Sequence, residues 1–231
     1  KSAERTLPLG LNIGRNKWSE DPVEDYVLCL TKLYPLADYI TVNVSSPNTV
    51  GLRKMQNKEA LQQLLSALQA EHANLKKNHQ RHVPILLKIA PDLDEKDMHN
   101  IAEVVLDKAI DGLIISNTTI QRPDALSSAH KKEMGGLSGK PLFGQSTIVL
   151  REMARITEQK IPLIGIGGIA SGANAYAKIR SGASLVQLYS ALVYHGFDLV
   201  TRIKHELAEL LEKDGFATVD DAVGTGISEW L

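Results

Sequence analysis

The chain has little cysteine, few aromatic residues and almost no net charge. Its 231 residues include one cysteine, 5% aromatic residues and a formal net charge of -1. The lone Cys29 excludes an internal disulfide and a multi-cysteine metal site. Balanced charge offers nothing that would hold a nucleic acid or an anionic membrane surface. No apolar run reaches the roughly 20 residues that a membrane-spanning helix needs.

What the sequence does contain is a regular alternation of short apolar runs and longer amphipathic stretches. The apolar runs, bounded by turn residues, predict six strands, at 9–13, 39–44, 84–89, 112–116, 163–166 and 185–188. The amphipathic stretches that follow them predict six helices, at 22–34, 58–75, 94–109, 146–157, 171–181 and 198–213.

Strict alternation of strand and helix predicts a parallel sheet, because each parallel pair of strands needs a crossover connection. Two architectures satisfy this, an open doubly wound sheet and a (β/α)8 TIM barrel. The first strand lacks the G-x-G-x-x-G turn of a dinucleotide fold, whereas a Gly-rich turn at 165–168 follows the penultimate strand. Barrels commonly bind a phosphate with the loops after strands seven and eight. We therefore expect an α/β fold of the (β/α)8 TIM barrel type.

This numbering of the strands also gives an expectation about the extent of the domain. If the last two strands are the seventh and eighth, the chain supplies about six βα units, strands 3–8. The first residue is Lys1 rather than Met, and no signal or transit segment is recognisable. We expect residues 1–231 to form the C-terminal major part of one barrel domain, with two strands upstream.

Polar side chains recur at the carboxyl ends of the predicted strands, which form the working face of a parallel barrel. In chain order these positions are Asn12, Asn43, Lys88, Asn117, the pair Gly167-Gly168 and Tyr189. A single buried Asn is usually a satisfied hydrogen-bonding group of the core. Recurrence at the same end of successive strands favours a ligand site instead.

Lys88 is the most informative of these residues because it interrupts the apolar run 85–89. Lysine is rarely fully buried unless it is paired. An ion pair with a neighbouring strand is one explanation, but Asp38 and Asp111 stand only at the starts of those strands. An anionic or electron-rich ligand is the better partner. The turn 167–168 can point backbone N–H groups at a phosphate, although such turns also serve ordinary strand-to-helix geometry.

The segment 43–52, NVSSPNTVGL, supplies amide groups, two hydroxyls and a proline-stiffened loop at the end of a strand. An ordinary Asx or Ser turn is the simpler interpretation. Ser46 belongs to no G-x-S-x-G motif, so nucleophilic hydrolysis is not expected. His72, His79 and His82 lie in a basic, polar stretch without carboxylate ligands, and we expect no metal site.

Together these motifs resemble the dihydroorotate dehydrogenase family. The resemblance covers nearly the whole chain, through the segments 10–14, 43–52, 88–92, 116–119, 135–142, 165–172 and 187–190. Ser46 stands where the soluble class 1 enzymes carry Cys, which is similar to class 2, the quinone-reducing, membrane-associated enzymes. Cys29 cannot replace it, because it lies on a surface-type helix. Ser116 stands where many class 2 members have Thr, which keeps the hydroxyl.

The resemblance implies FMN-dependent oxidation of dihydroorotate to orotate in de novo pyrimidine biosynthesis, with electrons passing from reduced FMN to a quinone such as ubiquinone. Ser46 would be the catalytic base, with Thr49 as a candidate relay, because serine is a poor base at its free pKa. The residues implied to bind substrate are Asn43, Asn48, Asn117 and Thr118. Those implied to bind FMN are Asn12, Asn43, Lys88, Ser116, Gly139, Gly168, Tyr189 and Ser190.

The resemblance further implies N-terminal helices, absent from this chain, that form a quinone tunnel and contact the membrane. That membrane would be the mitochondrial inner membrane, or the bacterial cytoplasmic membrane in a prokaryote. Two other functions stay open. One is another FMN barrel oxidoreductase that acts on a different pyrimidine or uses fumarate or a nicotinamide cofactor. The other is a non-catalytic barrel that binds a phosphorylated ligand.

Overall fold

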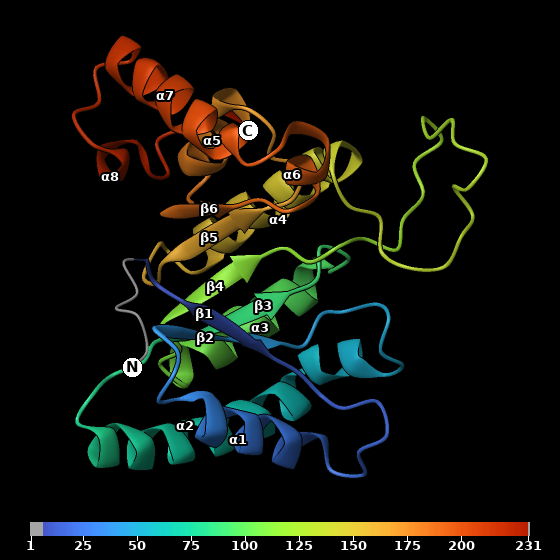
Figure 1. The fold of residues 1–231 in the computed structure, drawn as a ribbon, viewed down its shortest axis with the longest axis vertical. Coiled ribbons are helices and arrows are strands. Elements are labelled where there is room, and N and C mark those ends of the chain that lie inside the picture. Colours follow the sequence, from blue (N-terminus) through green and yellow to red (C-terminus); the bar gives the residue numbers. More distant parts are fainter. Residues whose placement is uncertain (1–6, 231) are drawn as a thin grey trace.

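The computed structural model describes residues 7–230, and Figure 1 shows its fold. Six parallel strands form one curled sheet in the order β1-β2-β3-β4-β5-β6. Each strand pairs with the next strand along the chain, without the reversal of order that marks a doubly wound sheet. The α/β barrel architecture is thereby confirmed. The strands are β1 Gly10–Ile13, β2 Tyr39–Asn43, β3 Ile85–Ile89, β4 Gly112–Ile115, β5 Leu163–Ile166 and β6 Leu185–Gln187.

Helices connect the strands and cover the outer face of the sheet (Figure 1). The α-helices are α1 Pro22–Leu33, α2 Lys58–His79, α3 Glu95–Asp107, α4 Phe143–Ile156, α5 Gly172–Arg180, α6 Ser190–His195, α7 Asp198–Lys213 and α8 Val219–Ala222. The 3-10 helices are η1 Leu52–Gln56, η2 Lys140–Leu142 and η3 Ile227–Trp230. Within residues 7–230, no helix combines the length and the apolar character needed to cross a membrane.

The helix boundaries follow local capping chemistry. Asp21, Asp94 and Ser171 are N-caps whose side chains accept hydrogen bonds from the first turns of α1, α3 and α5, as short polar side chains do at helix starts. Two predicted boundaries were wrong. α2 ends at His79 rather than at 75. α4 begins at Phe143 rather than at 146, because the 3-10 turn that contains Pro141 leads directly into it.

The two faces of the sheet differ in chemistry, because successive side chains along a strand point to opposite sides. The outer face contributes residues such as Val42, Leu87 and Ile115 to the main hydrophobic core. On the inner face, Leu86, Ile114 and Ile164 form a small apolar cluster. Figure 1 also shows a long loop that leaves β4 and projects away from the sheet before returning to α4.

Candidate active site

Two cavities adjoin the carboxyl ends of the strands, and one of them extends along the inner face of the sheet to Gly10 and Tyr39, the first residues of β1 and β2. The first has a volume of about 370 Å³ and a mostly polar lining that includes Asn12, Thr41, Asn43, Ser46, Lys88, Asn117 and Gln187. The second has a volume of about 350 Å³ and a lining that includes Lys88, Ser116, Asn117, Thr118, Gly139, Gly168, Tyr189 and Ser190. Lys88 and Asn117 line both, so the cavities meet at these two side chains. All the residues predicted to contact ligand, except Asn48, line one cavity or the other.

An amide and hydroxyl network joins the ends of β2 and β4. The Asn43 Oδ1 atom accepts hydrogen bonds from the Ser45 hydroxyl at 3.0 Å and from Asn117 Nδ2 at 3.2 Å. Asn117 Oδ1 accepts one from the backbone N–H of Thr118 at 2.8 Å. The Tyr26 hydroxyl donates to the Asn43 carbonyl at 2.7 Å. These bonds fix which amide atoms face the cavity, and amides can both donate to and accept from a ligand.

Lys88 lies opposite Asn43 in the register of β2 and β3. Its side chain is partly buried, and within residues 7–230 it has no hydrogen bond and no ion pair. Burial lowers the pKa of Lys88 from its ordinary value, because desolvation disfavours the charged ammonium. The ion-pair explanation therefore does not apply among the described residues. An anion bound in the cavity would supply the missing partner.

Ser46 and Asn48 lie on the loop after β2. Ser46 is partly buried at the wall of the first cavity, and its Oγ atom accepts a hydrogen bond from the Asn48 backbone N–H at 3.3 Å. Asn48 is exposed and lines neither cavity. Among the described residues no hydrogen bond joins Ser46 to Thr49, the candidate relay. Ser46 thus faces the cavity, and no group among the described residues accepts a hydrogen bond from its hydroxyl.

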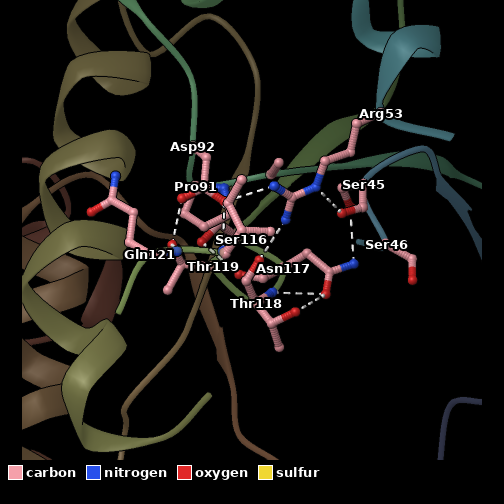
Figure 2. A network of polar contacts seen from close by, with 12 residues as sticks. Ser45, Ser46, Arg53, Pro91, Asp92, Ser116, Asn117, Thr118, Thr119 and Gln121 are labelled. Atoms are coloured by element: carbon pink, nitrogen blue, oxygen red, sulfur yellow. Dashed lines mark hydrogen bonds and ion pairs between the residues drawn. The ribbon is translucent and has the colours of Figure 1, made fainter. Parts of the chain in front are cut away.

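A charged network that sequence reasoning missed holds three of the loops together (Figure 2). The Arg53 guanidinium donates to the Ser45 carbonyl at 3.1 Å, to the Thr118 carbonyl at 2.8 Å and to the Asp92 carboxylate at 2.7 Å. One side chain therefore bridges the loops after β2, β3 and β4. Because these loops carry Ser46 and Thr118, Arg53 fixes their relative positions.

Asp92 is the acceptor at the centre of the same network. Its side chain, 11% exposed, also accepts from the Thr119 hydroxyl, the Ile120 backbone N–H and the Gln145 side chain. Burial alone would raise the pKa of this carboxyl, but these hydrogen bonds and Arg53 outweigh it and lower the pKa. The only signal in the sequence was that Arg53 and Asp92 adjoin the two most distinctive loop motifs.

The β5–β6 side of the site is built from backbone rather than side chains. Gly167 and Gly168 have φ angles of +107° and +75°, which L side chains rarely adopt. A Cβ atom on Gly168 would lie 2.6 Å from the Phe143 Cβ, so the turn packs directly on the start of α4. Within residues 7–230 the N–H groups of Gly168 and Ile169 donate no hydrogen bond. Free amides of this kind suit an anion.

Comparison with known proteins identifies the family to which this chain is similar. The family model described as dihydroorotate dehydrogenase matches residues 1–211. A dihydroorotate dehydrogenase (quinone) of Azorhizobium caulinodans is 53% identical over 219 residues, which cover 95% of this chain and 62% of that protein. The mitochondrial dihydroorotate dehydrogenase (quinone) of Oryza sativa subsp. japonica is 55% identical over 217 residues, covering 94% of this chain and 46% of that protein.

A solved structure agrees with these sequences. The crystal structure of DHODH from Eimeria tenella in complex with ferulenol superposes with a TM-score of 0.93 at 38% sequence identity, covering 98% of this chain and 64% of that one. This chain thus spans between about half and two thirds of the length of the relatives it matches. By its sequence, its strand order and its site, the chain belongs to class 2 of the dihydroorotate dehydrogenase family.

Proposed function

We propose that the protein to which this chain belongs oxidises dihydroorotate to orotate with FMN as cofactor and a quinone as electron acceptor. The observation that carries the proposal is the junction of the two cavities at Lys88, a cation without a protein partner among the described residues. A flavin ring and a pyrimidine carboxylate are the electron-rich ligands that such a junction accommodates. The relatives, which are named dihydroorotate dehydrogenase (quinone), supply the substrate and the acceptor.

The described residues fit FMN in three respects. The glycine turn leaves amides free for a phosphate, and Gly139, Tyr189 and Ser190 line the same cavity. Lys88 would supply a cation to offset negative charge on a reduced flavin ring. Ser116, and Asn12 and Asn43 in the adjoining cavity, offer polar contacts to a ring edge. When bound, FMN supplies the acceptor for the hydride that leaves C6 of the substrate.

The chain's own residues have distinct tasks in this proposal. Ser46 removes the C5 proton of dihydroorotate and passes it to water, since no protein acceptor bonds to it among residues 7–230. Asn43, Asn117 and Thr118 hold the pyrimidine amide edges and the carboxylate, with Asn48 completing the set from the rim of the Ser46 loop. Arg53 keeps the loops of Ser46 and Thr118 in register.

The barrel and the membrane contact are part of the same proposal. Leu185 on the edge strand β6 is 63% exposed, which suits further strands that pair with β1 and β6 and complete an eight-stranded barrel. Helices upstream of residues 1–231 would hold the quinone and contact the membrane. The mitochondrial name of a plant relative supports a location at the mitochondrial inner membrane, and the bacterial relatives support the bacterial cytoplasmic membrane.

The decisive experiment is Ser46→Ala in the full-length protein, with flavin reduction by dihydroorotate followed anaerobically by stopped-flow absorbance. Loss of a positioned base lowers this rate by about 10²- to 10⁴-fold, while flavin content stays unchanged. Ser127→Ala, at an exposed serine outside both cavities, is the matched control. Reduction of Ser46→Ala at the wild-type rate would contradict the proposed role. Comparison of quinone, fumarate and NAD as acceptors tests the second half-reaction.

A further inference from the structure

A buried lysine lies behind the glycine turn and has no task in the proposed reaction. Lys178 on α5 is 0% exposed, and its Nζ atom donates a hydrogen bond of 2.6 Å to the Ser146 hydroxyl on α4. The same ammonium lies 5.2 Å from the centroid of the Phe143 ring. No carboxylate pairs with it among the described residues.

The two side chains that Lys178 contacts are those on which the turn rests. The Ser146 hydroxyl lies 3.2 Å from the Gly167 carbonyl oxygen and 3.1 Å from the Phe143 carbonyl oxygen. A Cβ atom on Gly167 would lie 2.7 Å from Ser146 Oγ, and one on Gly168 would lie 2.6 Å from Phe143 Cβ. Gly167 and Gly168 line the second cavity, whereas Lys178 does not. Any effect of Lys178 on the cavity must therefore pass through the turn.

Stability does not account for a cation at this position. Burial lowers the pKa of Lys178 to about 7, which shows how strongly the surroundings oppose the charged form. An apolar side chain of similar length would fill the same space without that cost. A buried charge that weakens the fold is typical of a site whose task requires it.

Among the described residues, no charged group on the neighbouring helices forms a hydrogen bond or ion pair with Lys178. On α4, Arg151 contacts Glu152. On α7, which packs against α5, Glu206 accepts from the Gly172 backbone N–H and contacts Arg202. Strands β5 and β6 contribute no charged residue. On α5 itself, Arg180 contacts the Thr225 hydroxyl. The charge behind the turn is therefore that of Lys178.

We propose that Lys178 is a positioning residue for an anion site at the glycine turn, and that it raises affinity for the phosphate of the cofactor. A protonated Lys178 occupies the Ser146 oxygen as donor, so the one Ser146 hydrogen points to a backbone carbonyl, Gly167 or Phe143. The turn is then held with its free amides toward the cavity, and the ammonium places positive charge behind them. The identity of the anion as FMN rests on the proposed function.

Comparison of FMN with riboflavin, which lacks the phosphate, isolates this effect. At pH 6 we expect Lys178→Met in the full-length protein to weaken FMN binding by about 10- to 100-fold, the effect of losing the one charge-assisted hydrogen bond that holds the turn, and to change riboflavin affinity by less than about twofold. The readout is the quenching of flavin fluorescence on titration. Lys160→Met, at an exposed lysine that pairs with Glu158, is the matched control and leaves both affinities unchanged.

Two further measurements separate positioning from general damage. Ser146→Ala removes the link to the turn, so the double variant should lose little more FMN affinity than Lys178→Met alone. The FMN affinity advantage of the wild type over Lys178→Met should also shrink as pH rises from 6 to 9, because Lys178 then loses its proton. A mutation that only disturbed packing would show neither pattern.

The outcomes are distinguishable from those of the proposed function. A full-length wild type that binds neither FMN nor riboflavin would overturn the proposed function and this inference together. Wild-type binding of FMN combined with unchanged FMN affinity in Lys178→Met would overturn the inference alone. Equal weakening of FMN and riboflavin would do the same, because the effect would then not pass through the phosphate.

Discussion

The two halves of the site are held in different ways. At the ends of β2, β3 and β4, side chains form a paired network. Arg53 and Asp92 form an ion pair, and Arg53 also donates hydrogen bonds to backbone carbonyls, so that three loops are joined. At the ends of β5 and β6, a glycine turn presents backbone amides, and among the described residues the buried Lys178 contacts a hydroxyl and an aromatic ring but no carboxylate. In the first half the interactions that shape the site also stabilise the fold. In the second half the charge that shapes the site opposes folding.

Lys88 stands where the halves meet, and its removal should have the largest effect among the variants that test this comparison. Lys88→Met should lower the rate of flavin reduction by dihydroorotate by about 10²- to 10³-fold, the cost of one electrostatic stabiliser of developing charge. Stopped-flow absorbance of the full-length protein measures it. Lys54→Met, on η1 and lining neither cavity, is the control. An unchanged rate would mean that Lys88 does not stabilise the charge that develops during flavin reduction.

Asp92→Ala removes the ion pair with Arg53 at the ends of β2, β3 and β4. Arg53 is then left without its carboxylate, so we expect a loss of about 2–4 kcal/mol of unfolding free energy at pH 7, measured by urea denaturation. The pKa of Asp92 is lowered in the folded state, so its contribution is present above the unfolded pKa of about 3.9 and is lost as pH falls through the lower folded pKa. The unfolding free energy of the variant should therefore fall less steeply than that of the wild type as pH is lowered below about 4. Equal pH dependence in both proteins would argue against this network.

Lys178→Met should raise the unfolding free energy, whereas Asp92→Ala lowers it. A folded pKa of about 7, against the ordinary value of 10.5, means that the unfolded state binds more protons between these pH values. Wild-type stability therefore rises with pH between about 7 and 10.5. Below this range the folded protein bears the full cost of burying the charged ammonium. The variant should be more stable by about 1–4 kcal/mol at pH 6 and no more stable above pH ~10.5. Thermal unfolding at both pH values checks this, and a less stable variant at pH 6 would mean that both halves stabilise the fold.

Ser190→Ala gives the smallest effect. The Ser190 hydroxyl donates to the Ser138 hydroxyl at 2.8 Å in an exposed position, and exposed neutral hydrogen bonds contribute little. We expect a loss of less than about 1 kcal/mol in FMN binding and no change in unfolding, both measured by titration and melting. A larger effect on FMN than that of Lys178→Met would place the main phosphate contact on α6 rather than at the glycine turn.

The sequence predicted those parts of the site that local pattern encodes. Asn43, Lys88 and Asn117 each follow or interrupt a strand, and the register of a parallel sheet brings such positions together without further information. Strand positions were recovered to within two residues because short apolar runs bounded by turn residues mark them directly.

The parts that could not be predicted depend on contacts between distant segments. Arg53 and Asp92 are 39 residues apart, and nothing near either residue indicates the other. Lys178 follows Ala177 on a helix where charge normally marks the exposed side. Its burial arises because α4 and the glycine turn close over it, and hydrophobic periodicity contains no information about that closure.

Lys88 and Asn117 form the shared wall of two cavities, so binding in one cavity affects binding in the other. An anion in either cavity stabilises the charged form of Lys88, which a ligand in the other cavity then meets. Each ligand must therefore change the affinity of the other by the same factor, by thermodynamic necessity. Binding in one cavity is thus coupled to binding in the other through a single side chain on β3.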